Sequence, residues 1–70
     1  MKITDSKSLG IALKTRRKEL HYTQLYLAEF TGLSVTFISD VERGKPTAEL
    51  EKTIRLANTL GLDIFLQKRG

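Results

Sequence analysis

Apolar residues recur at helical spacing along most of this chain and at strand spacing near its end. Residues 7–20 place an apolar stripe on one face, which predicts a first helix capped by Asp5, Ser6 or Ser8. The stripe consists of Leu9, Ala12, Leu13 and Leu20. His21 follows, at a position where the chain leaves the helix and often needs a left-handed backbone.

Two shorter helices follow, and each is preceded by a hydroxyl residue suited to be its N-cap. Thr23 predicts a helix over residues 24–30. Ser34 predicts another over residues 35–43, and Gly44 is the residue that ends it.

A fourth helix is expected after the only proline, Pro46, with Thr47 as N-cap and Gly61 just past its end. Glu49 and Glu51 fall in its first turn, where negative charge suits the helix dipole. Its predicted buried face consists of Leu50, Ile54, Ala57 and Leu60.

The end of the chain changes period. Apolar residues alternate over residues 62–68, which predicts a β-strand. A single strand in a helical chain has no partner of its own, so we expect it to pair with the same strand of a second copy across a twofold axis. The alternative is a frayed or helical tail. The expected dimerisation residues are Leu62, Ile64, Phe65 and Leu66.

The stretch from Gln24 to Glu42 organises the rest. Ala28 lets two helices approach closely, and Gly32 supplies the positive φ of a tight turn. Ile38 and Val41 lie on one face of the second helix of this pair. Together they predict a helix-turn-helix; the alternative is a plain helical hairpin in a small bundle.

Seventy residues make one domain, residues 1–70, with a helical core over residues 8–61. A hydrophobic core in so small a domain gives only marginal stability. There is no cysteine and one histidine, which excludes disulfides and thiolate metal sites and argues against zinc. A homodimer is the remaining way to bury more surface. No signal peptide or membrane-spanning run is visible, and the absence of cysteine fits the cytoplasm.

The sequence offers no catalytic constellation. No Ser/His/acid or Cys/His set can be assembled, and no glycine-rich phosphate loop is present. No acid lies in an apolar cluster that would tune a catalytic pKa. We therefore expect neither enzyme activity nor a cofactor.

The charge favours a polyanionic partner. The formal net charge is +4, from 12 basic and 8 acidic residues. Both nucleic acid and an anionic membrane attract such a chain. The apolar stripes are typical of core-facing helices, so nucleic acid is the favoured partner and a membrane is not expected.

Arg17 lies beside the apolar stripe of the first helix, so its charge must be paired or reach solvent. Glu42, at the end of the third helix, is its predicted partner in a structural ion pair. The alternative is that Arg17 binds a phosphate.

The start of the second helix predicts a phosphate site formed by exposed backbone N–H groups and the Gln24 amide. Capping alone explains Thr23 but does not explain Gln24. Arg43 and Lys45 follow the third helix, where phosphate contact and a solvated loop are equally open. Phe37 is expected to be partly exposed, against the DNA backbone or the second helix.

The outer face of the third helix is small and mostly neutral, and it could enter a major groove. The predicted base-reading residues are Val35, Thr36, Ser39 and Asp40. Val35 and the Thr36 methyl group suit a thymine methyl, the hydroxyls suit donor or acceptor edges, and Asp40 could accept from cytosine N4. Phosphate repulsion argues against that role for Asp40.

Leu25 and Tyr26 are expected to face solvent on the second helix. Large apolar groups in that position can bind a partner or pack against the first helix, and both possibilities stay open.

These motifs resemble the Cro/phage-repressor-type (XRE) helix-turn-helix family. The resemblance covers about residues 8–62 and implies an all-α, lambda-repressor-like fold of four helices. It rests on TQ at 23–24, LA at 27–28, TGLS at 31–34, IS at 38–39, ERGK at 42–45 and ANTLGL at 57–62. Four helices followed by a short apolar strand are similar to HipB-type antitoxins, which dimerise through that strand, repress their own operon and bind a HipA-type serine/threonine kinase toxin.

The resemblance implies phosphate contacts at Gln24 and Ser34, base reading by the third helix, and the Arg17–Glu42 pair as part of the fold. Val35 and Thr36 depart from it, because glutamine is often found at these positions. Readout of DNA shape then gains importance.

Two functions follow as expectations. The first is a homodimeric repressor that binds a near-palindromic operator in double-stranded DNA, either as the antitoxin of a HipBA-like operon or as a general XRE-family regulator without a toxin. The second is a protein-interaction module that mainly neutralises a toxin, with Leu25 and Tyr26 as candidate contacts.

Overall fold

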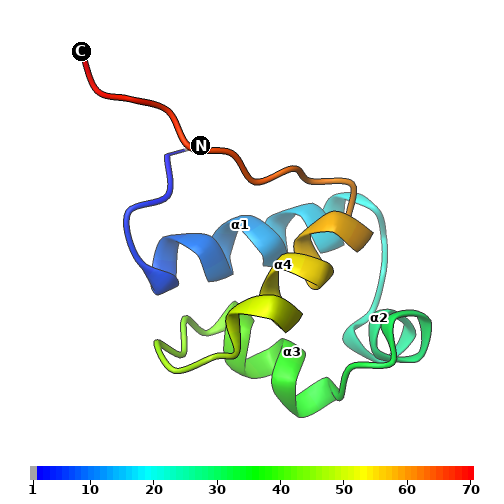
Figure 1. Cartoon of the computed structure of the whole chain (residues 1–70). Helices are drawn as coiled ribbons and strands as arrows, with labels where there is room; N and C mark the ends of the chain where they lie inside the picture. Colours follow the sequence, from blue (N-terminus) through cyan, green and yellow to red (C-terminus); the bar gives the residue numbers. More distant parts are fainter. Residues whose placement is uncertain (1) are drawn as a thin grey trace.

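Four helices make up the fold in a computed structural model that describes residues 2–70 (Figure 1). They are α1 (Ser6–Glu19), α2 (Gln24–Thr31), α3 (Val35–Glu42) and α4 (Leu50–Thr59). The helix-turn-helix expectation is met by α2 and α3, and α1 and α4 pack over them.

The first three helices begin at side chains that accept a hydrogen bond from the backbone. Asp5 caps α1 in a capping box with Ser8, and hydrogen bonds from Ser8 lower the pKa of the Asp5 carboxyl. Thr23 and Ser34 accept from the N–H groups of Tyr26 and Phe37, each over 3.0 Å. These caps are local, which is why the sequence predicts them.

His21, Gly32 and Gly44, which lie between consecutive helices, each have a positive φ. His21 has a φ of 60° and ends the α1 segment, and Gly32 has a φ of 77° in the turn between α2 and α3. Both were expected from the sequence, since His tolerates this conformation better than most residues and glycine adopts it freely.

The start and the buried face of α4 differ from the prediction. Glu49, not Thr47, occupies the N-cap position and makes no side-chain capping bond, so only Glu51 lies in the first turn. Leu50 is 70% exposed, whereas Leu56 is fully buried. The side chains of α4 and its C-cap that enter the core are Thr53, Leu56, Ala57 and Leu60, with Ile54 half-buried.

A turn explains this difference. The chain turns through residues 45–48 before α4 starts, with the Ala48 N–H donating to the Lys45 carbonyl oxygen over 3.3 Å. The helix therefore begins later than the Thr47 cap would imply, and Leu50 lies at its first residue. Thr53 can be buried because its hydroxyl donates to the Glu49 carbonyl oxygen over 2.8 Å.

The core lies where all four helices meet. Leu13, Leu27, Ile38, Leu56 and Leu60 are its largest fully buried side chains. Gly10 permits the close approach of α1 to the end of α3: a Cβ atom there would lie 2.7 Å from the Glu42 carbonyl oxygen and closer still to that of Val41.

Residues 62–70 form no strand within this single chain; they first run back past α1, on its side remote from α3, and then leave the helices (Figure 1). Leu62 packs against the core, but Ile64, Phe65 and Leu66 are exposed. Pairing with a second copy stays a prediction. Among residues 2–70, no helix is long and apolar enough to cross a membrane.

Candidate nucleic-acid interface

The outward face of α3 is the central feature of the candidate site. Val35 and Thr36 are exposed at the start of the helix, and Ser39 and Asp40 are half-buried one turn later. Ile38 and Val41 are buried on the opposite face and hold α3 on the core. The four predicted base-reading residues thus share one helix, with Val35 and Thr36 the more accessible.

The starts of α2 and α3 carry hydrogen-bond donors. The hydroxyl oxygens of Thr23 and Ser34 accept backbone N–H bonds, so each hydroxyl keeps its proton for an outside acceptor. The first N–H groups of each helix have no partner within that helix. Together with the positive end of the helix dipole, these donors suit a phosphate oxygen.

Gln24 has a partner within the protein. Its Nε2 donates to Glu42 Oε1 over 3.0 Å. The amide nitrogen keeps one further N–H, and this can donate to a phosphate. The contact with Glu42, which the sequence did not predict, gives Gln24 a structural role beside the predicted phosphate contact.

Arg17 and Glu42 form a buried ion pair, with side-chain exposures of 9% and 4%. Arg17 donates to both carboxylate oxygens, over 2.7 and 3.0 Å, and also to the Tyr22 carbonyl oxygen over 2.8 Å. The hydrogen bond to Glu42 raises the pKa of the Arg17 guanidinium, against the opposing effect of burial. The pair joins α1 to the end of α3 and orients Gln24, and it leaves Arg17 engaged inside the protein instead of free for a phosphate.

Asp40 is paired with the two cations that follow α3. Its Oδ1 lies 2.6 Å from Arg43 Nη2, and its Oδ2 lies 3.5 Å from Lys45 Nζ. Arg43 and Lys45 are otherwise accessible to solvent, as a phosphate-contacting pair would have to be. A base that donates to Asp40 would therefore share the carboxylate with these two cations.

Phe37 is half-buried against the core, and Lys52 of α4 places its Nζ 5.9 Å from the ring centroid. From the sequence, the DNA backbone or α2 was expected beside this ring, and α4 was not. Phe37 therefore helps to seat α3 on the core, and contact of its ring with DNA stays a prediction.

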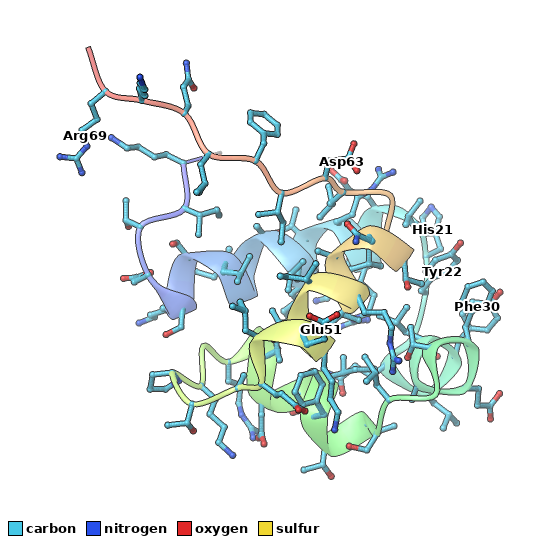
Figure 2. The ribbon with its side chains drawn as sticks, viewed as in Figure 1. His21, Tyr22, Phe30, Glu51, Asp63 and Arg69 are labelled. Atoms are coloured by element: carbon cyan, nitrogen blue, oxygen red, sulfur yellow. The ribbon has the colours of Figure 1, made fainter. Side chains whose placement is uncertain are left out.

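Two further features were not predicted from the sequence. Arg16 Nε donates to the Leu60 carbonyl oxygen over 2.9 Å, which ties α1 to the end of α4. Phe30 is 69% exposed and stacks with Tyr26, with ring centroids 6.3 Å apart; the Tyr26 ring in turn lies 5.0 Å from that of Tyr22. Figure 2 shows Tyr22 and Phe30 at the α2 end of the molecule. Tyr22, Tyr26 and Phe30 follow one another at a spacing of four residues along the chain, a pattern that could have revealed this aromatic row.

Comparison with known proteins agrees with this geometry. A family model described as helix-turn-helix matches residues 13–66. The chain belongs to the helix-turn-helix family. That match spans the end of α1, all of the α2–turn–α3 unit and α4.

Two relatives of this helix-turn-helix protein have similar sequences. One is the "ImmF control region 10 kDa protein" of Bacillus phage phi105, 36% identical over 64 residues, which are 91% of this chain and 71% of the relative. The other is the "Uncharacterized HTH-type transcriptional regulator y4mF" of Sinorhizobium fredii, 36% identical over 69 residues, or 99% of this chain and 91% of the relative.

Solved structures of HipB are similar over the whole chain. The "HipB-O4 20mer complex" and the "Structure of HipA-HipB-O2-O3 complex" each give a TM-score of 0.90 at 26% identity, and each match covers 100% of this chain and 99% of the other. This protein is therefore a helix-turn-helix transcriptional regulator with a HipB-like structure, as the resemblance implied. Its family is typically non-enzymatic.

Proposed function

We propose that this protein is a homodimeric repressor that binds a near-palindromic DNA operator through α3. The observation that carries this proposal is the make-up of the helix-turn-helix unit. This unit and the turn after it carry the exposed start of α3, the capped starts of α2 and α3, and the cations Arg43 and Lys45. Phosphate contacts would give affinity and register, and α3 would give sequence choice.

The base-reading role falls mainly on Val35 and Thr36, because they are the most exposed of the candidates. Their methyl groups suit thymine methyls in the major groove, and the hydroxyls of Thr36 and Ser39 suit polar base edges. Thr23, Gln24 and Ser34 would position the backbone of the DNA. Sequence-dependent DNA shape would supply the remaining selectivity.

A homodimer would present two copies of α3 to successive major grooves, about 34 Å apart. The exposed apolar tail supports this arrangement, because pairing of residues 62–68 between two chains would leave α3 uncovered on the far side of the molecule. An operator of about 20 base pairs would hold two such half-sites, whose centres lie one helical turn apart.

Selection of bound duplexes from a random DNA pool, repeated across a salt series, tests the proposal. We expect an inverted repeat with half-sites about one turn apart, and affinity that falls steeply with salt. Thr36→Arg should change the selected half-site, whereas Thr15→Arg, an equal charge change on the exposed face of α1, should not. Salt-sensitive binding without any enriched motif would contradict sequence-specific repression.

A second candidate function is that of an antitoxin that represses its own promoter and binds a HipA-type kinase. The exposed side chains of Leu25, Tyr26 and Phe30 favour a protein partner on α2, and one similar solved structure is an assembly of HipA and HipB. A kinase encoded next to this chain should co-purify with it. Tyr26→Ala with Phe30→Ala should abolish that association, whereas Leu50→Ala, an equally exposed apolar site on α4, should retain it.

A further inference from the structure

We propose that Asp40 restrains sequence-independent DNA binding by holding Arg43 and Lys45 in ion pairs on the recognition helix. This inference rests on the proposed DNA-binding function and assigns a control element to the same surface. It gives Asp40 a role other than base reading: the carboxylate competes with DNA phosphates for the two cations.

The geometry joins one acid to two cations. Each carboxylate oxygen of Asp40 has its own cation, Arg43 at 2.6 Å and Lys45 at 3.5 Å. The Asp40 side chain is 21% exposed, while those of Arg43 and Lys45 are 71% and 53% exposed. The acid is therefore held near the helix, and the cations reach over it from the solvent side.

The backbone places Arg43 and Lys45 beside Asp40. At the end of α3 the Lys45 N–H donates to the Asp40 carbonyl oxygen over 3.0 Å, and the Gly44 N–H donates to the Val41 carbonyl oxygen over 2.9 Å. Gly44 has a φ of 84°, which completes a Schellman turn. The turn folds Lys45 back beside Asp40, so the pairing does not depend on a flexible loop.

On α3, Asp40 is the acid that is available to pair with Arg43 and Lys45. Glu42, the other acid on α3, is buried with Arg17 and Gln24. Of the charged groups on α3 and its C-terminal turn, the solvent-accessible ones are thus Asp40, Arg43 and Lys45, with a net charge of +1. Removal of the carboxylate would raise this to +2 and free both cations.

Sequence-independent DNA binding is almost entirely electrostatic, so a change in these charges acts on it directly. Each exposed ion pair is weak, and phosphates can outcompete it. Asp40 is therefore expected to weaken binding to any DNA without preventing it. The affinity would then depend more on base contacts by Val35 and Thr36 than it would without the Asp40 carboxylate.

The test compares Asp40→Asn with Glu51→Gln in the full chain. Glu51 is exposed in the first turn of α4 (Figure 2), whereas Arg43 and Lys45 pair with Asp40, so its substitution makes the same change in net charge without freeing either cation. The probes are a 20-base-pair duplex without the selected motif, titrated at several salt concentrations, and heparin. Asp40→Asn should bind the duplex roughly three- to tenfold more tightly than wild type and elute from heparin at higher salt.

Cations that are no longer paired with Asp40 should also change the salt dependence of DNA affinity. The slope of log affinity against log salt should steepen by about 0.9 for each additional phosphate that the variant neutralises. In an Arg43→Gln/Lys45→Gln background the effect of Asp40→Asn should disappear, because the acid acts through these cations. An equal effect in that background would show direct repulsion and overturn the proposal, as would an Asp40→Asn variant that binds no tighter than Glu51→Gln.

The outcomes also separate this inference from the proposed function. If wild type selects an operator and Asp40→Asn only loses a cytosine preference within it, the repressor stands and Asp40 is a base reader. If no operator is selected but Asp40→Asn tightens binding through Arg43 and Lys45, the restraint stands and sequence-specific repression fails.

Discussion

At the scale of single residues, the buried pair of Arg17 and Glu42 is the most consequential contact. Glu42→Ala should destabilise the protein by about 3–5 kcal/mol, because Arg17 would keep its charge in the core without a partner. Gln24 would lose its hydrogen bond at the same time. Urea denaturation followed by circular dichroism measures the change in the free energy of unfolding.

The matched control for this pair is Arg17→Met combined with Glu42→Leu. Replacing both charges by apolar groups of similar volume removes the desolvation penalty, so the double variant should recover most of the lost stability. A double variant as unstable as Glu42→Ala would mean that the hydrogen bonds to Gln24 and Tyr22, not the buried charge, dominate.

Residue-level prediction from the sequence succeeded mainly where the deciding neighbours are close along the chain; the Arg17–Glu42 pair, predicted and present although its partners are 25 residues apart, is an exception. Thr23 and Ser34 cap helices that begin at the next residue, so the pattern contains both partners. Asp40 was predicted as a possible base contact, although its spacing of three residues from Arg43 already favours a pair on one helix face. The Gln24–Glu42 bond was not predicted, because it depends on how α2 and α3 cross.

At the scale of elements, α1 and α3 approach so closely that Gly10 has no room for a side chain. Gly10→Ala would ordinarily stabilise a helix by about 0.5–1 kcal/mol. Here the methyl group meets the Val41 and Glu42 carbonyl oxygens, so we expect a loss of about 1–3 kcal/mol instead. Thr15→Ala, at an exposed site of the same helix, should be neutral or slightly stabilising in the same thermal unfolding experiment.

The start of α4 and the choice of its buried face are the clearest case where prediction from the sequence failed. Thr47 has the right chemistry for an N-cap, and Leu50 has the right spacing for a buried face. The turn through residues 45–48 overrides both, because the backbone after α3 must first complete its Schellman hydrogen bonds. Gly44 also lies close against Lys7 of α1, a contact that no local sequence pattern records.

Two substitutions distinguish the observed buried face of α4 from the predicted one. Leu56→Ala should destabilise by about 2–5 kcal/mol, because it opens a cavity in a fully buried site. Leu50→Ala should change stability by about 0.5 kcal/mol or less, because Leu50 is largely exposed. If the two variants lost comparable free energy of unfolding in urea denaturation, the observed buried face of α4 would be contradicted.

At the scale of the whole molecule, an apolar surface lies opposite α3. A hollow of ≈ 330 Å³ is bordered by Ile3, α1, the end of α4 and the start of the tail. Ile11, on α1, is exposed, as are Ile64, Phe65 and Leu66 of the tail. The tail's alternating pattern was readable from the sequence, but its pairing was not, because that depends on a second copy.

This apolar surface predicts that the tail controls oligomeric state. Deletion of residues 63–70 keeps Leu62, whose backbone N–H donates to the Ala57 carbonyl oxygen over 3.0 Å, and should leave the four-helix core folded. Sedimentation velocity should then show a monomer, and operator affinity should fall because one α3 reaches only one half-site. Deletion of residues 67–70 removes Lys68 and Arg69 but retains the alternating apolar residues, so that variant should remain dimeric. If the longer deletion also sediments as a dimer, a surface of the helical core joins the two copies instead, and the exposed Ile11 on α1 becomes the position to substitute.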